Sequence, residues 1–152
     1  MEPLSGFVVV GVDGSESSVA ALRVAAEEAS ARDAKLHIVV AWHVPLAVYT
    51  DGLPPPPEVA TDMKDAAEDI AKLAESKVPA GIEYEIMMRE GQPQDVLVEE
   101  SKGAEVLVVG SRGLGAFSRL VLGSVSEHVS HHATCPVVVV PPTDTDDREP
   151  AE

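Results

Sequence analysis

Residues 106–126 read VLVVGSRGLGAFSRLVLGSVS, and the prediction of the fold starts from this stretch. It opens with the apolar run VLVV, which is typical of a buried strand. Glycines follow at positions 110, 113, 115 and 123, four of the eleven in the chain, before a polar segment that begins at Ser124. Glycine lacks a Cβ atom, so it permits sharp turns and a close approach of the backbone to another group. The stretch therefore predicts a strand, a glycine-rich loop and the start of a helix.

Strand and helix patterns alternate along the rest of the chain. Apolar runs predict strands at residues 7–12, 36–44, 82–89, 105–110 and 136–140, and helical periodicity predicts helices at 17–32, 58–77, 93–101 and 124–132. Residues 45–57 end in four consecutive prolines, so they are predicted to form a loop. The helix that follows is expected to carry one broad apolar face, made of Met63, Ala66, Ala67, Ile70, Leu73 and Ala74. This alternation indicates an α/β fold in which helices cover both faces of a mostly parallel sheet.

Three turns are expected at the carboxyl edge of this sheet. They are formed by residues 12–15, 41–43 and 110–113, each at the end of a predicted strand. Open parallel sheets bind ligands at this edge, where the strand order reverses. The turns therefore predict a binding site, and the glycine-rich loop is its most informative part.

Two well-known phosphate-binding motifs do not fit the glycine-rich loop. A P-loop requires a Gly-Lys pair, which the chain lacks, and the dinucleotide motif GxGxxG requires glycine where Ser118 stands. The remaining spacing is Gly110-x2-Gly113-x9-Gly123-Ser124. A helix that starts at Ser124 would direct free amide groups at an anion, and Arg112 would add positive charge. These features predict a phosphate site, and a plain strand-to-helix connection is the alternative.

The spacing G-x2-G-x9-G-[ST] resembles that of the nucleotide-binding universal stress proteins, and the resemblance extends over almost the whole chain. It includes VVVGVDGS at residues 8–15, VGSRG at 109–113, LGSVS at 122–126 and CPVVVV at 135–140. The chain is therefore identified as a member of this family, in its ATP-binding subgroup.

The resemblance implies a fold and a ligand. The fold is an open five-stranded parallel sheet of order 3-2-1-4-5, a Rossmann-like fold of the adenine nucleotide alpha hydrolase type. The ligand is ATP together with Mg²⁺, and the implied site residues are Gly11, Val12, Asp13, Val40, Ala41, Gly110, Ser111, Arg112, Gly113, Gly123, Ser124, Val125 and Ser126. The family also implies a homodimer that pairs the last strand, Val137–Val140. No catalytic residue and no metal-ligating side chain is assigned.

Composition limits the other classes of function. The formal net charge of −15 argues against nucleic acid or anionic membranes as partners, because both attract basic surfaces. No apolar run is long enough for a membrane helix, no signal peptide is evident, and Cys135 has no internal partner for a disulfide. A cytoplasmic location is expected. Residues 1–140 are predicted to form one domain, and residues 141–152 an acidic tail.

Several residues keep two interpretations at this point. Asp13 either contacts the ligand or only shapes the turn before the first helix, and Trp42 either packs beside adenine or fills the core. His128, His131 and His132 lie at a spacing that can bind metal, but a helix C-terminal position explains them better. Cys135 is interpreted as a small core residue. A slow Mg²⁺-dependent ATPase, or a scaffold that binds AMP or a cyclic nucleotide, is the alternative function.

Overall fold

The chain forms one five-stranded sheet with four helices, seen in a computed structural model that describes residues 6–45, 49, 51–112 and 122–141. The elements follow one another as β1 (Phe7–Gly11), α1 (Glu16–Ala31), β2 (Lys35–Trp42), α2 (Pro57–Lys77), β3 (Tyr84–Glu90), α3 (Pro93–Glu100), β4 (Val106–Gly110), α4 (Ser124–His132) and β5 (Val137–Val140). All nine elements predicted from the sequence are present, with ends that differ by one or two residues. Gly113 and the acidic tail beyond residue 141 lie outside the described residues.

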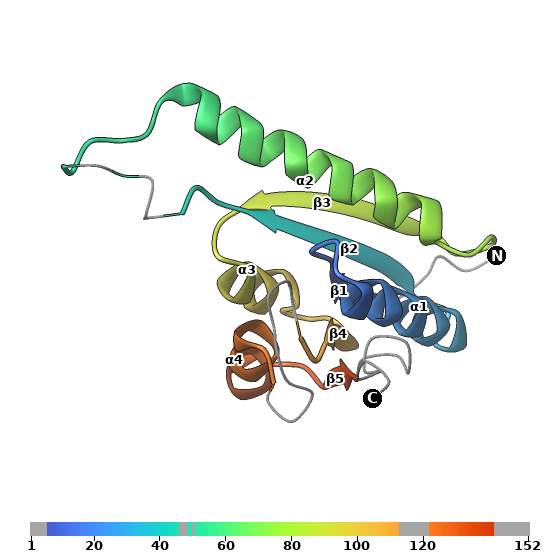
Figure 1. The fold of residues 1–152 in the computed structure, drawn as a ribbon. Coiled ribbons are helices and arrows are strands. Elements are labelled where there is room, and N and C mark those ends of the chain that lie inside the picture. Colours follow the sequence, from blue (N-terminus) through green and yellow to red (C-terminus); the bar gives the residue numbers. More distant parts are fainter. Residues whose placement is uncertain (1–5, 46–48, 50, 113–121, 142–152) are drawn as a thin grey trace, which may run out of the picture.

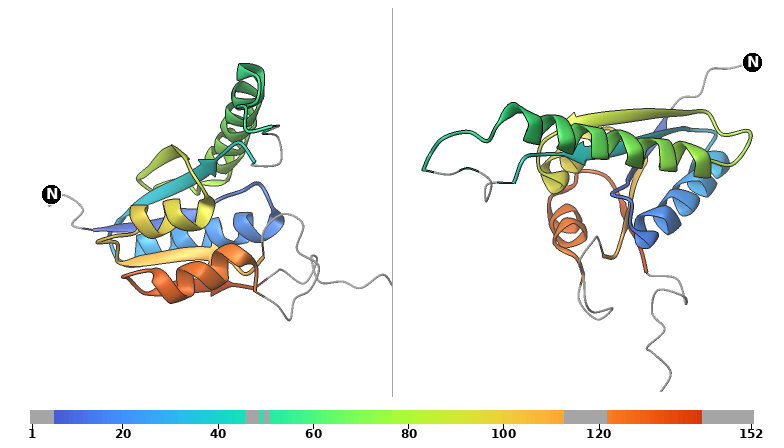
Figure 2. Two further views of the ribbon diagram at one scale, coloured as in Figure 1. Left: turned by 90° about the vertical axis from the view of Figure 1, so that its left-hand side faces the viewer. Right: turned by 45° about the horizontal axis from the view of Figure 1, so that its top comes forward.

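The strands lie in the order β3-β2-β1-β4-β5, and every neighbouring pair is parallel (Figure 1). This confirms the predicted fold class and strand order. Helices α1 and α2 cover one face of the sheet, and α3 and α4 cover the other (Figures 1 and 2). Both faces are therefore covered, which explains why the sequences of the central strands β1 and β4 are continuously apolar instead of alternating.

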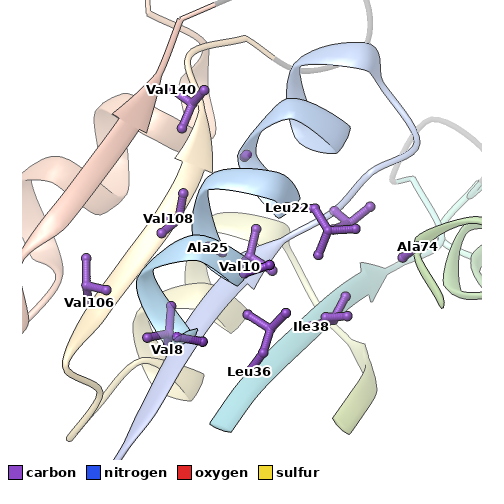
Figure 3. Close-up of a cluster of buried hydrophobic side chains, with 14 of the residues drawn as sticks. Val8, Val10, Leu22, Ala25, Leu36, Ile38, Ala74, Val106, Val108 and Val140 are labelled. Atoms are coloured by element: carbon purple, nitrogen blue, oxygen red, sulfur yellow. The ribbon is translucent and has the colours of Figure 1, made fainter. Parts of the chain in front are cut away.

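Two apolar cores hold the three layers together. Alternate residues of the central strands point to opposite faces, so Val8 and Val10 pack under α1 while Val9 points towards α3 and α4. The first core includes Leu22, Ala25, Leu36, Ile38, Val106 and Val108 (Figure 3). The second is built on Val39, Leu97, Leu107, Val109 and Val129. Cys135 packs against the second core, in agreement with the prediction.

Helix α2 buries less apolar surface than its sequence predicts. Only Ala67 and Ala74 are buried, whereas Ala66 is exposed and Leu73 keeps 39% of its surface exposed. The broad apolar face predicted from the sequence is therefore only partly buried. The reason is that α2 lies over β2 and the edge strand β3, at one side of the sheet (Figure 2). Among the described residues, no helix is both long and apolar enough to span a bilayer.

Candidate functional site

The carboxyl ends of β1, β2 and β4 are neighbours in the sheet. Strand β1 is central and pairs with both β2 and β4. From β1 the chain continues into α1 on one face, and from β4 it reaches α4 on the other. The order of strands therefore reverses between β1 and β4, which is where parallel sheets of this kind bind ligands.

The turn after β1 is held by Asp13. The Asp13 Oδ1 atom accepts hydrogen bonds from the backbone amide of Ser15 (2.9 Å) and from its hydroxyl (2.5 Å). Ser15 in turn caps α1 by accepting a hydrogen bond from the Ser18 amide (3.2 Å). Gly14 has a φ of +87°, and a Cβ atom there would lie 3.4 Å from Ile70 of α2. Asp13 therefore stabilises the turn, while Ser15 caps the helix, and the contact of Asp13 with a ligand stays a prediction.

The backbone N–H and C=O of Ala41 point to the position beyond the end of β1, where that strand no longer pairs with β2. The Val12 amide donates to Val39 O (3.0 Å), so the backbone N–H and C=O of Val39 point towards β1. The Gly91 amide donates to Trp42 O (2.8 Å), so the backbone groups of Trp42 point towards β3. Because backbone polar groups alternate along a strand, the N–H and C=O of Ala41 point to the β1 side. There β1 has already turned away at Asp13, and the described backbone hydrogen bonds beyond the ladder include none to Ala41. A donor and an acceptor are therefore presented side by side at this edge.

Val40 plays a different part from its neighbour. Its backbone groups point to the β3 ladder, and its side chain is fully buried. Val12 likewise is 4% exposed and uses its amide to bond β2. These two predicted site residues therefore support the edge at Ala41 and offer no exposed side chain.

The end of β4 and the start of α4 are joined by hydrogen bonds to one carbonyl. Ser111 O accepts from the Gly123 amide (2.7 Å) and from the Ser126 hydroxyl (3.1 Å), which also approaches Gly123 O at 3.0 Å. The Ser111 amide is bonded to Val140 O of β5 (2.8 Å). Both ends of the glycine-rich loop are thus fixed at one point, beside β5.

This arrangement changes the expected role of Ser126. Its side chain is 1% exposed and its hydroxyl hydrogen is used on main-chain carbonyls, so only its backbone amide remains for an anion. Gly123 caps α4 without any side-chain hydrogen bond, and Ser124 is exposed at the first helical position. The first-turn amides of Ser124 and Val125 have no acceptor within the helix. A helix N-terminus of this kind favours an anion.

Two of the predicted glycines have a packing role. A Cβ atom on Gly110 would collide with the Ser17 hydroxyl and lie 2.9 Å from the Ser17 carbonyl carbon. A Cβ atom on Gly11 would lie 2.7 Å from a methyl group of Leu97 in α3. The sequence interpretation assigned these glycines to ligand contact, whereas the structure shows that α1 and α3 need them in order to approach the sheet.

The sequence did not predict the contacts that Ser17 and Ile70 make at this site. Ser17 is buried against Gly110, and its hydroxyl, like that of Ser111, has no hydrogen-bond partner among the described residues. Ile70 packs under the Asp13 turn. Neither contact has a local sequence signal, because each joins a helix to a distant strand end.

Two of the α4 histidines contact each other, and one of them also lies close to α3. The rings of His128 and His132 stack with centroids 4.1 Å apart, and the Nδ1–H of His132 donates to His128 O (2.9 Å). His128 also lies 3.7 Å from Asp95 of α3. Within the part of the chain that the structure describes, no three His, Cys, Asp or Glu side chains are grouped so that they could hold a metal ion.

The chain has an open parallel sheet with a helix N-terminus at the point where the strand order reverses. This defines an α/β domain of the kind that binds small anionic ligands. Residues 7–141 match the model of the universal stress protein family. The chain belongs to this family. It is 37% identical over 142 residues to a universal stress protein of Mycolicibacterium smegmatis, a match that covers 88% of this chain and 47% of that protein. The chain thus spans about half the length of the curated relatives it matches.

Solved structures of universal stress proteins share the fold. One, in complex with cAMP, is 32% identical and superposes with a TM-score of 0.59, covering 91% of this chain and 98% of the other. Another, from Archaeoglobus fulgidus in complex with dAMP, has a TM-score of 0.61 and covers 91% of this chain and 99% of the other. Its identity is 24%, so it supports the fold alone.

Proposed function

We propose that residues 1–140 form a cytoplasmic ATP-binding regulatory domain, in which nucleotide occupancy changes the state of a homodimer. The observation that carries this proposal is the N-terminus of α4, which receives no capping hydrogen bond from a side chain of the described residues and is fixed to the end of β4 through Ser111 and Ser126. It lies at the same sheet edge as the outward-facing backbone of Ala41. An anion site and an edge that can bond a base are the two parts that an adenine nucleotide needs.

ATP would lie across this edge with its base at β2 and its phosphates at α4. Adenine presents a hydrogen-bond donor and an acceptor, which match the C=O and N–H of Ala41. Gly11, Val12 and Asp13 would border the adenosine. The phosphates would meet the amides of Gly123, Ser124, Val125 and Ser126, and the segment Gly110–Gly113 with Arg112. Mg²⁺ on the phosphates would reduce the repulsion between ATP and a chain of net charge −15.

The relative in complex with cAMP, at 32% identity, supports an adenine nucleotide as the ligand and leaves the phosphate number to experiment. Competition among ATP, AMP and cAMP decides this point. Binding is proposed ahead of catalysis, because no general base is assigned to the phosphate site. A turnover assay of wild type and Asp13→Ala tests the slow ATPase: a wild-type rate above the buffer blank, lost in the variant, would establish it.

The dimer would form through β5. Of the described strands, only β4 pairs with β5, and the N–H and C=O of Val137 and Val139 face away from β4. An uncovered edge of four valines is prone to pair with another chain. Val139→Pro removes an outward N–H and leaves the bonds of β5 to β4, so it should shift the dimer to monomer in light scattering. Val139→Thr keeps that N–H and should stay dimeric. A monomeric wild type would refute this part.

Ser124→Pro is the sharpest test of the phosphate site. Proline is well tolerated at the first helical position, and Gly123 already has the extended conformation that a residue before proline requires (φ −65°, ψ 161°). The variant loses one amide N–H of α4 while the helix is kept. We expect ATP affinity to fall about tenfold in calorimetry, as for one charge-assisted hydrogen bond. Ser124→Ala, which keeps the amide, should lose less, and equal affinity in wild type and Ser124→Pro would contradict the proposal.

A further inference from the structure

The connection between β2 and α2 contains the apolar run LPPPP at residues 53–57, which we call the proline ridge. Its last proline, Pro57, is the first residue of α2, a position that proline suits well. Pro54 and Pro55 precede both the helix and its cap, so starting α2 does not require them. Leu53 keeps 65% of its surface exposed. A continuous apolar run at the surface requires another explanation.

The conformation of the proline ridge is set by its own chemistry. Each of residues 53–56 stands before a proline, which disfavours helical backbone and favours an extended or polyproline II conformation. Pro56 has a φ of −54° and a ψ of 148°, which are polyproline II values. The ridge is therefore a stiff polyproline II segment, and it loses little conformational entropy when it binds.

Both ends of the proline ridge are held by local structure. Asp51 and Gly52 precede it with φ values of +50° and +74°, the left-handed pair that a tight turn uses. At the other end, the Val59 amide donates to Pro56 O (3.0 Å) at the start of α2. Figure 1 and the right-hand view of Figure 2 both show the segment beyond the end of the sheet, far from α1, α3 and α4. The ridge is thus accessible to another molecule.

Exposure along the proline ridge follows the repeat of a polyproline II helix. Such a helix has about three residues per turn, so residues three apart share one edge. Leu53 and Pro56 are both exposed, and so are Pro54 and Pro57, whereas Pro55 is half-buried. Two edges therefore face solvent and the third is turned towards the protein. The solvent-facing edges carry two apolar pairs, one on each side of Pro55.

We propose that the proline ridge is a docking ligand for a partner protein domain with an aromatic-lined groove. Grooves of this kind pack aromatic side chains against PxxP segments in the polyproline II conformation, and Pro54 and Pro57 supply that pattern. Asp51 and Glu58, which are exposed, flank the ridge with negative charge, so the rim of the groove is basic. Docking at the ridge does not require a nucleotide at the strand ends.

The test uses the whole chain and three ¹⁵N-labelled probes, an SH3, a WW and an EVH1 domain, each chosen with a basic groove rim. Pro54→Ala removes a ring from a solvent-facing edge, and Pro55→Ala removes one from the edge turned towards the protein. Both variants gain similar backbone freedom, so comparing them cancels the loss of stiffness. We expect wild type to shift groove resonances of at least one domain. Pro54→Ala should bind that domain with at least about fivefold lower affinity than Pro55→Ala.

Four results would overturn the proposed docking role. If millimolar wild type shifted no groove resonance of any probe, the ridge would not be a ligand for such grooves. Equal affinities of Pro54→Ala and Pro55→Ala would place the contact elsewhere on the chain. A lower melting temperature in Pro54→Ala alone would assign its ring a structural role. A change of oligomeric state in Pro54→Ala, seen by light scattering, would assign the ridge to contact between copies of this chain.

Discussion

Replacing Gly110 by alanine separates the packing role of the glycines from a role in ligand binding. The new Cβ atom would lie 2.9 Å from the Ser17 carbonyl carbon and 3.0 Å from the Ser17 carbonyl oxygen, and closer still to its hydroxyl. The hydroxyl can rotate away, but the backbone of α1 cannot, so the first turn of α1 must shift from β4. Overpacking of this kind costs about 1–3 kcal/mol of stability. For a domain of this size each kcal/mol lowers the melting temperature by about 2–4 °C.

The assay is chemical unfolding of the ligand-free protein, with Gly11→Ala as the comparison. The nearest atoms to the Cβ atom of Gly11→Ala would belong to the side chain of Leu97, with its methyl groups at 2.7 and 3.0 Å, and a side chain can shift more readily than a backbone. We therefore expect Gly11→Ala to destabilise less than Gly110→Ala. Adding Ser17→Ala to Gly110→Ala should not restore stability, because the contacts to the backbone of Ser17 remain. Wild-type stability of ligand-free Gly110→Ala would refute this reasoning.

Three further predictions concern single side chains. Ser126→Ala should lower the free energy of unfolding by about 0.5–1.5 kcal/mol. The loss is modest because the amides of Gly123 and Glu127 still donate to the two carbonyls that the hydroxyl bonds. Denaturant titration of this variant, with Ser130→Ala beside it, measures the loss. Ser15→Ala should cost about 1 kcal/mol through loss of the α1 cap, measured in the same way; an unchanged midpoint would contradict it. Burial lowers the pKa of His37 below its ordinary 6.5, against the opposing pull of Glu85, so the folded state resists protonation. The free energy of unfolding should therefore fall as pH drops through 6.5 towards the lower folded-state pKa, and less steeply in His37→Gln; parallel curves would be inconsistent with this.

The fold could be predicted because each of its signals is local. The apolar run before Gly110 and the proline run before α2 mark element ends by their own chemistry. Strand order came from the resemblance, and the pairing of β1 with both β2 and β4 confirms it. The narrow buried stripe of α2 could not be predicted, because it depends on where the helix lies over the sheet.

The site was predicted in its parts but not in how they fit together. The sequence indicated a helix start at Ser124, which the structure confirms. It gave no sign that the Ser126 hydroxyl donates to the carbonyl of Ser111, or that Ser17 packs where a Cβ atom of residue 110 would lie. Such contacts join residues far apart in the chain, and no pattern along one segment encodes them. The direction of the Ala41 backbone also required the register of β2 between its neighbours.

The central claim is that one adenine nucleotide spans β2 and α4 at the carboxyl edge of the sheet. The most direct measurement is a ¹⁵N-labelled spectrum of the whole chain recorded while ATP is added. The account predicts the largest amide shifts at Ala41, Ser124 and Val125, with little change at Gly6 and Glu105 on the opposite edge. Shifts confined to that opposite edge, or none at saturating ATP, would contradict it.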